Sequence, residues 1–171
     1  TLDGVFEDPS FTMPFGFTEE MGIMLSGFME SCTGILLGRK TFEMFAPAWS
    51  TRTVEDDPGA PFFNDTTKHV VTSTLESADG VWQNSTIVGG YDADAIRELK
   101  NQGDLYISGS GTLVRALLAD GLVDELHLLV YPVVLGTGER LFDGMDELTL
   151  SLNATDTYDN GVVHLSYGPA Q

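Results

Sequence analysis

The chain has 171 residues, 42% hydrophobic and 10% aromatic, which is enough to bury the core of one compact globular domain and too apolar for a disordered chain. Its 26 acidic side chains outnumber 8 lysines and arginines, giving a formal net charge of −18 that argues against a nucleic-acid or anionic-membrane binding surface. Cys32 is the single cysteine, so no disulfide can form within the chain.

The apolar segments are too short for a membrane protein. None approaches the roughly 20 residues that a spanning helix needs, and the longest, 126–135, is interrupted by Pro132. The chain opens with the polar residues 1–4, so we expect no signal peptide. These features predict a cytoplasmic protein.

The first third of the chain predicts two helices around a buried strand. Residues 18–32 form an amphipathic pattern that Thr18 can cap. The apolar run 34–38 predicts a strand, and the helix that follows it should end at Pro47. The acidic residues of 50–66 predict an exposed loop.

Strands and helices then alternate to the end of the chain. Strands are expected at 68–73 and 85–90, and Asp92 should cap the helix 92–103. The remaining predicted elements are a strand at 104–108, a helix at 112–121, a strand at 124–136, and a hairpin at 148–167 that turns at Asp159-Asn160-Gly161.

This alternation predicts one α/β domain over residues 1–171. The sheet should be mostly parallel, with helices on both faces, and the C-terminal hairpin should add antiparallel edge strands. Residues 1–4 read as the end of a strand, so we expect a first strand to be missing upstream of residue 1.

Two predicted turns suit an anionic ligand. "LLGRKTF" (36–42) and "ISGSGTL" (107–113) each lead from a strand through glycine into a helix, whose N-terminal N–H groups can bind phosphate. One such turn could serve packing alone, but two favour a dinucleotide held across the carboxyl ends of the strands. Arg39 and Lys40 favour NADP over NAD. Neither turn has the G-x-G-x-x-G or the P-loop spacing.

Other polar residues give weaker signals. His127 is expected to be a hydrogen-bonded structural histidine, His164 has no partner spacing, and no cluster of metal ligands is apparent. Ser110 lacks the nucleophile-elbow pattern of a hydrolase. Arg115 and Arg140 are expected at the surface or in a dimer contact.

At these motifs the sequence resembles a known family. The stretches "TLDG", "LLGRKTFEMFAPAW", "VVTSTL", "DLYISGSGTLVRALLADGLVDELHLLVYPVVLGTGERLF" and "GVVHLSY" follow the order typical of the dihydrofolate-reductase-like superfamily. The closest branch resembles the reductase domain of the bifunctional riboflavin-biosynthesis deaminase–reductase and its stand-alone relatives. The resemblance implies an NADPH-binding α/β fold, a small-molecule substrate and a homodimer.

The resemblance also implies roles for individual residues. The implied cofactor contacts are Gly38, Arg39, Lys40 and Thr41 at the phosphates, Thr72 and Ser73 on the adenosine side, and Ser108, Gly109, Ser110, Gly111, Thr112 and Leu113 at the pyrophosphate and nicotinamide ribose. Phe45 and Trp49 would contact the substrate, and Asp3 would be a catalytic residue near the nicotinamide. From the residues alone, Asp3 could equally be a turn residue before Gly4, and Trp49 a core aromatic.

The chain departs from its relatives in two places. Dihydrofolate reductases place a carboxylate in the first helix, whereas here the acids Glu19, Glu20 and Glu30 lie near the ends of 18–32. This argues against efficient dihydrofolate reduction. The zinc motifs of the deaminase half, H-x-E and P-C-x-x-C, do not occur.

The sequence therefore predicts an NADPH-dependent reductase that transfers a hydride to a small unsaturated substrate, such as a pterin, a pyrimidine, an imine or a carbonyl compound. Two alternatives remain open at this point. One is a nucleotide-binding or sensor module without catalysis, and the other is a structural or assembly role without nucleotide affinity.

Overall fold

The computed structural model describes residues 1–170, and the chain divides into two compact units. The first unit comprises Thr1–Met24 and Arg115–Gln171, and the second comprises Leu25–Val114. Two helices, α1 (Glu19–Ser31) and α5 (Gly111–Ala119), contribute residues to both units.

The second unit is built on a four-stranded parallel sheet with the order β3-β2-β1-β4. Its strands are β1 (Cys32–Gly38), β2 (Thr67–Val71), β3 (Ser85–Gly89) and β4 (Asp104–Tyr106). The central strand β1 contains the apolar run 34–37, whose residues are all buried, as expected of a strand that is covered on both faces.

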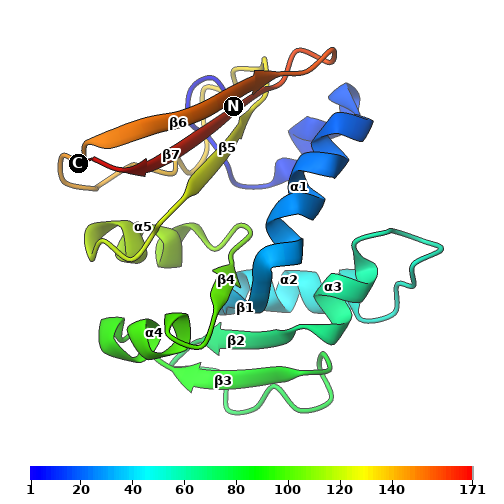
Figure 1. The fold of residues 1–171 in the computed structure, drawn as a ribbon, viewed down its shortest axis with the longest axis vertical. Coiled ribbons are helices and arrows are strands. Elements are labelled where there is room, and N and C mark those ends of the chain that lie inside the picture. The colour runs from blue at the N-terminus through cyan, green and yellow to red at the C-terminus, as the bar shows by residue number, and fades with distance from the viewer. Residues whose placement is uncertain (171) are drawn as a thin grey trace. The chain divides into compact units, whose positions relative to one another are not determined.

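Helices connect these strands. The chain passes from β1 to β2 through α2 (Arg39–Trp49) and α3 (Ala60–Asp65), and from β3 to β4 through α4 (Ala93–Lys100). These two crossovers run in opposite directions across the sheet. Because crossovers are right-handed, their helices lie on opposite faces. In Figure 1, α2 lies behind the sheet and α4 nearer the viewer.

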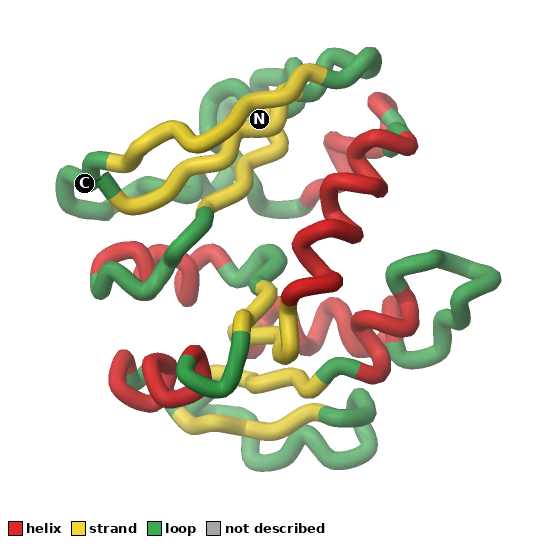
Figure 2. The backbone as a smooth tube through the Cα atoms, in the orientation of Figure 1, coloured by secondary structure: helices red, strands yellow, loops and turns green. Residues whose placement is uncertain are grey.

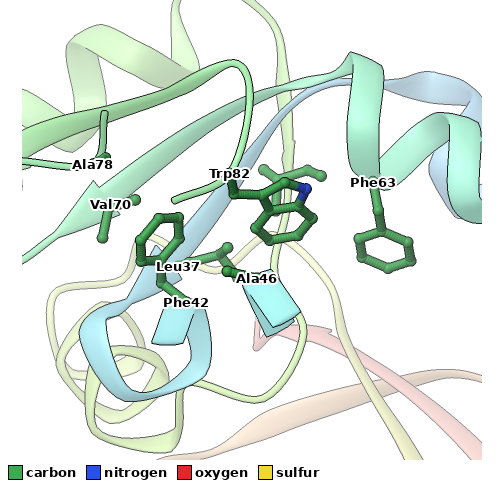
Figure 3. Close-up of a cluster of buried hydrophobic side chains, with 8 residues drawn as sticks. Leu37, Phe42, Ala46, Phe63, Val70, Ala78 and Trp82 are labelled. Carbon is green, nitrogen blue, oxygen red and sulfur yellow. The ribbon is translucent and has the colours of Figure 1, made fainter. Parts of the chain in front are cut away.

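An aromatic core joins α2 and α3 to the sheet. Phe42 is fully buried and stacks on Trp82 at a centroid distance of 6.2 Å, while Leu37 and Val70 approach from β1 and β2 (Figure 3). This apolar layer fixes the start of α2 against the sheet, and therefore the position of the turn between β1 and α2.

The first unit holds an antiparallel sheet of three strands. β5 (Leu126–Val130), β6 (Leu150–Thr157) and β7 (Val163–Pro169) are arranged in the order β5-β7-β6 (Figure 2). A short 3-10 helix, η1 (Pro9–Phe15), brings Phe11 and Phe15 against Tyr131, beside the buried residues Met21 and Val162.

The α/β class, the parallel sheet with helices on both faces and the C-terminal hairpin are confirmed. The hairpin strands do not extend the parallel sheet at its edge, because they pair with β5 in a separate antiparallel sheet. Thr18 also caps α1 as predicted, since its hydroxyl accepts the Met21 N–H at 3.3 Å. The strand predicted at 124–136 is shorter, and it pairs in the antiparallel sheet. A single domain over residues 1–171 stays a prediction.

Three local predictions were wrong. Pro47 does not end α2, because it removes one N–H while the Ser50 N–H still closes the last turn on the Ala46 carbonyl at 2.9 Å. The loop predicted at 50–66 contains the helix α3. Residues 2 and 3 lie in a turn rather than in a strand.

Candidate nucleotide-binding site

The two predicted anion-binding turns meet at the carboxyl edge of the parallel sheet. β1 and β4 are hydrogen-bonded neighbours, and each ends in one of these turns. From β1 the chain first moves to β2 and β3 on one side, and β4 then returns to the other side. The edge between β1 and β4 is therefore a topological switch point, where open α/β sheets bind their ligands.

The first turn leaves the N-terminus of α2 open. Gly38 is the cap residue, with extended φ and ψ of −77° and 157°, and no side chain caps the helix. The N–H groups of its first turn can therefore bind an anion, which the helix dipole also favours. Lys40 is exposed at this end. Arg39 is engaged instead by Glu43, whose carboxylate oxygens lie 2.9 and 3.1 Å from Nη1.

The second turn is folded against the first. Gly109 and Ser110 both have positive φ, at 62° and 55°, just before α5 begins. Ser110 makes two hydrogen bonds to the other turn: its Oγ accepts the Gly38 N–H at 3.0 Å, and its own N–H donates to Thr41 Oγ1 at 2.9 Å. The two turns thus form one hydrogen-bonded structure.

Asp3 belongs to the first unit, and its carboxylate is heavily hydrogen-bonded there. It accepts the Thr1 hydroxyl at 2.6 Å and the Gly136 N–H at 2.8 Å. These bonds lower the pKa of the Asp3 carboxyl to about 2. The Arg140 Nε donates to the Asp3 backbone carbonyl at 2.8 Å. The sequence did not reveal this partner, because it lies 137 residues along the chain.

The sequence matches the RibD C-terminal domain family over residues 1–164. This chain belongs to that family. The resemblance inferred from the motifs is therefore confirmed. The RibD C-terminal domain is reductase-like, and reductases of this family typically use NADH or NADPH.

Individual proteins resemble this chain in sequence or in fold. The uncharacterized protein YyaP of Bacillus subtilis is 28% identical over 176 residues, which span 98% of this chain and 89% of the relative. Among solved structures, a Shewanella protein provisionally named for riboflavin biosynthesis superposes with a TM-score of 0.70 at 22% identity, covering 85% of this chain and 78% of the other. A pyrimidine reductase-like protein of Corynebacterium diphtheriae gives 0.67 at 14% identity, covering 100% and 89%. At these identities the superpositions show the fold.

The turns of this RibD C-terminal domain protein fit the phosphates of a nicotinamide cofactor. Two helix N-termini face one edge of the sheet, and α2 has no side-chain cap. Gly109 is exposed, and a Cβ atom added at this position would lie 3.4 Å from the Thr41 side chain. Glycine therefore suits this close approach of the two turns. N–H donors, glycines and Lys40 are the groups that recognise phosphate.

Thr72 and Ser73 follow β2, which pairs with β1, so they lie at the same carboxyl edge. Thr72 is buried, and its hydroxyl accepts the N–H groups of Thr74 and Leu75, both at 3.2 Å. This hydroxyl shapes the turn after β2. Ser73 is exposed and is the residue of this pair that can face a ligand.

The two aromatic residues predicted to contact the substrate lie on α2. The Trp49 ring stacks on Phe63 at 4.2 Å, and the Arg52 guanidinium lies over the ring at 4.8 Å. A stacked ring at that distance fills one face, so the guanidinium covers the other. Trp49 therefore has only its edge to offer a flat substrate. Phe45 is half-buried and packs edge-on against Phe63.

Sequence reasoning missed two polar networks. Buried Asn64 accepts the Trp82 indole N–H at 2.8 Å and donates to the carbonyls of Trp49 and Arg52, both at 3.0 Å. No sequence signal indicated this, because the partners lie 12 to 18 residues away.

The second network lies in the first unit around His164, for which the sequence showed no partner spacing. Its Nε2 is 3.0 Å from His127 Nδ1 and its Nδ1 is 3.1 Å from Asp156 Oδ2, while His127 Nε2 meets Glu125 at 2.9 Å. These residues lie on β5, β6 and β7 and just before β5, so strand pairing assembled them.

Proposed function

We propose that this RibD C-terminal domain protein is an NADPH-dependent reductase, which transfers a hydride to a small unsaturated heterocyclic, imine or carbonyl substrate of the pterin or pyrimidine kind. One observation carries the proposal. The two glycine turns that lead into α2 and α5 are hydrogen-bonded to each other at the switch point of the parallel sheet. Membership of a reductase-like family and the fold shared with a pyrimidine reductase-like protein support it.

The backbone would bind most of the cofactor. The N–H groups at the start of α2 and α5 would hold its phosphates, and glycine at position 109 keeps side-chain atoms out of their approach. When bound, NADPH would supply the hydride. The chain's own contribution is to orient the cofactor and to hold its charge, which matters in a protein of net charge −18.

Lys40 would give the preference for NADPH. It is exposed at the open end of α2, whereas neighbouring Arg39 is held by Glu43. A lysine is a compact point charge that suits a phosphate at the surface, so Lys40 is the stronger candidate for the 2′-phosphate. Arg39 would contribute only after exchanging its carboxylate partner.

Asp3 would not be the proton donor of the reaction. With its pKa lowered to about 2, the carboxyl is ionised at neutral pH and has no proton to give. We therefore assign the proton to water.

The variant Lys40→Ala tests the cofactor assignment. We expect NADPH to bind about tenfold more weakly, the loss of one charge-assisted phosphate contact, while the affinity for NADH changes less than about twofold. The control is Lys100→Ala, which removes the same charge at the end of α4, next to the start of β4 and so at the opposite edge of the sheet.

Two outcomes would contradict the proposal. Equal losses for NADPH and NADH in Lys40→Ala would remove the 2′-phosphate role of this residue. A folded wild-type protein that binds NADPH but oxidises it with no pterin, pyrimidine, imine or carbonyl compound would instead favour a sensor module.

A further inference from the structure

We infer that Ser110 and Thr41 are positioning residues, which lock the two phosphate-binding turns into one preformed cofactor site. This inference rests on the proposed function. It assigns the two hydroxyl groups to a contact within the protein, in addition to any contact with the cofactor.

The lock consists of two hydrogen bonds that run in opposite directions. The Gly38 N–H, at the end of β1, donates to Ser110 Oγ at 3.0 Å. The Ser110 N–H, just before α5, donates to Thr41 Oγ1 in the first turn of α2 at 2.9 Å. Each turn therefore satisfies a backbone donor of the other, over a sequence separation of 69 to 72 residues.

The backbone conformation of Ser110 indicates that its hydroxyl contributes to the turn. Its φ of 55° lies in the left-handed region, which glycine adopts freely and which strains the backbone of a serine. Gly109 precedes it with a φ of 62°, so a second glycine at 110 would suit the turn better on conformational grounds. The hydroxyl, which a glycine lacks, offsets this strain by accepting the Gly38 N–H.

The lock would act on the whole phosphate site. The helix N-termini of α2 and α5 must hold fixed positions for their N–H groups to reach one pyrophosphate together. The pairing of β1 with β4 brings the two turns to one edge of the sheet, but it ends at Ile35 and Tyr106, before either turn begins. The two hydroxyl contacts fix the spacing of the turns directly, which lowers the cost of ordering the turns when the cofactor binds.

The test compares Ser110→Gly and Thr41→Val with the wild type by titration with NADPH and NADH. Ser110→Gly removes the hydroxyl and also relieves the strained backbone, so we expect its melting temperature to stay close to that of the wild type. We expect the affinity of each variant for both cofactors to fall at least about fivefold, which corresponds to the loss of one net hydrogen bond. Both cofactors should lose affinity by the same factor, because the lock does not involve the 2′-phosphate.

Matched variants separate positioning from a merely structural role. Thr41→Ser keeps the accepting oxygen and should restore binding to near the wild-type level, whereas Thr41→Val nearly matches threonine in shape and should not. The double variant Ser110→Gly/Thr41→Val should bind little more weakly than either single variant, because the spacing of the turns needs both hydrogen bonds and is already lost when one is removed.

The outcomes distinguish the two proposals. Wild-type affinity in both Ser110→Gly and Thr41→Val would overturn the lock and leave the proposed function standing. Losses that multiply in the double variant would show independent contacts and would also overturn it. A folded wild-type protein that binds neither cofactor would overturn the proposed function, and the lock with it.

Discussion

At the scale of single residues, Asp3 shows how hydrogen bonding decides what a carboxylate can do. Aspartate before glycine is common in turns, although residues 1–4 also read as the end of a strand, and the structure has the turn. The bonds from the Thr1 hydroxyl and the Gly136 N–H stabilise the ionised form and lower the pKa to about 2. Gly136 lies 133 residues away, so the sequence could indicate the turn and not the charge state.

The variant Asp3→Asn tests this ionised state through the pH dependence of stability. The folded-state pKa is lower than the ordinary value of 3.8, so the contribution of Asp3 to stability is present above about pH 4 and is lost as the pH falls towards 2. We expect the wild type to exceed Asp3→Asn in free energy of unfolding at neutral pH, by a margin that shrinks over that interval. Chemical denaturation at several pH values measures it, and a margin independent of pH would contradict the assignment.

At the scale of elements, α3 shows why part of the fold escaped prediction. It has only six residues, and two of them, Asn64 and Asp65, are poor helix formers in isolation. Tertiary contacts stabilise it: the ammonium of fully buried Lys68 donates to the carbonyls of Phe63 at 2.7 Å and Thr66 at 2.8 Å. Burial also lowers the pKa of Lys68 to about 8, so it is still largely protonated at neutral pH.

The variant Lys68→Met should therefore be strongly destabilising. It fills similar space but leaves buried carbonyls at the end of α3 unpaired, and we expect a loss of about 2 to 4 kcal/mol in the free energy of unfolding. The control Lys40→Met, at an exposed lysine in the first turn of α2, should change it by less than about 0.5 kcal/mol. Urea denaturation compares the two, and similar losses in both would show that the Lys68 cap contributes little.

At the scale of the whole molecule, the sequence predicted what depends on periodicity and local motifs. The alternating elements predicted the α/β class, and the glycines at 38, 109 and 111 predicted two turns at one sheet edge. The sequence did not predict contacts between side chains that are far apart in the chain. The hydrogen bonds from Ser110 to the α2 turn, the Asn64 hub and the His127–His164 pair all depend on which strands become neighbours.

The most direct test of the account is calorimetric titration of the wild-type protein with NADPH and with NADH. It should be run near physiological ionic strength, where a screening length of about 8 Å weakens the repulsion from a net charge of −18. We predict saturable binding of one cofactor per chain, tighter for NADPH than for NADH. A folded protein that binds neither nucleotide would contradict the central claim.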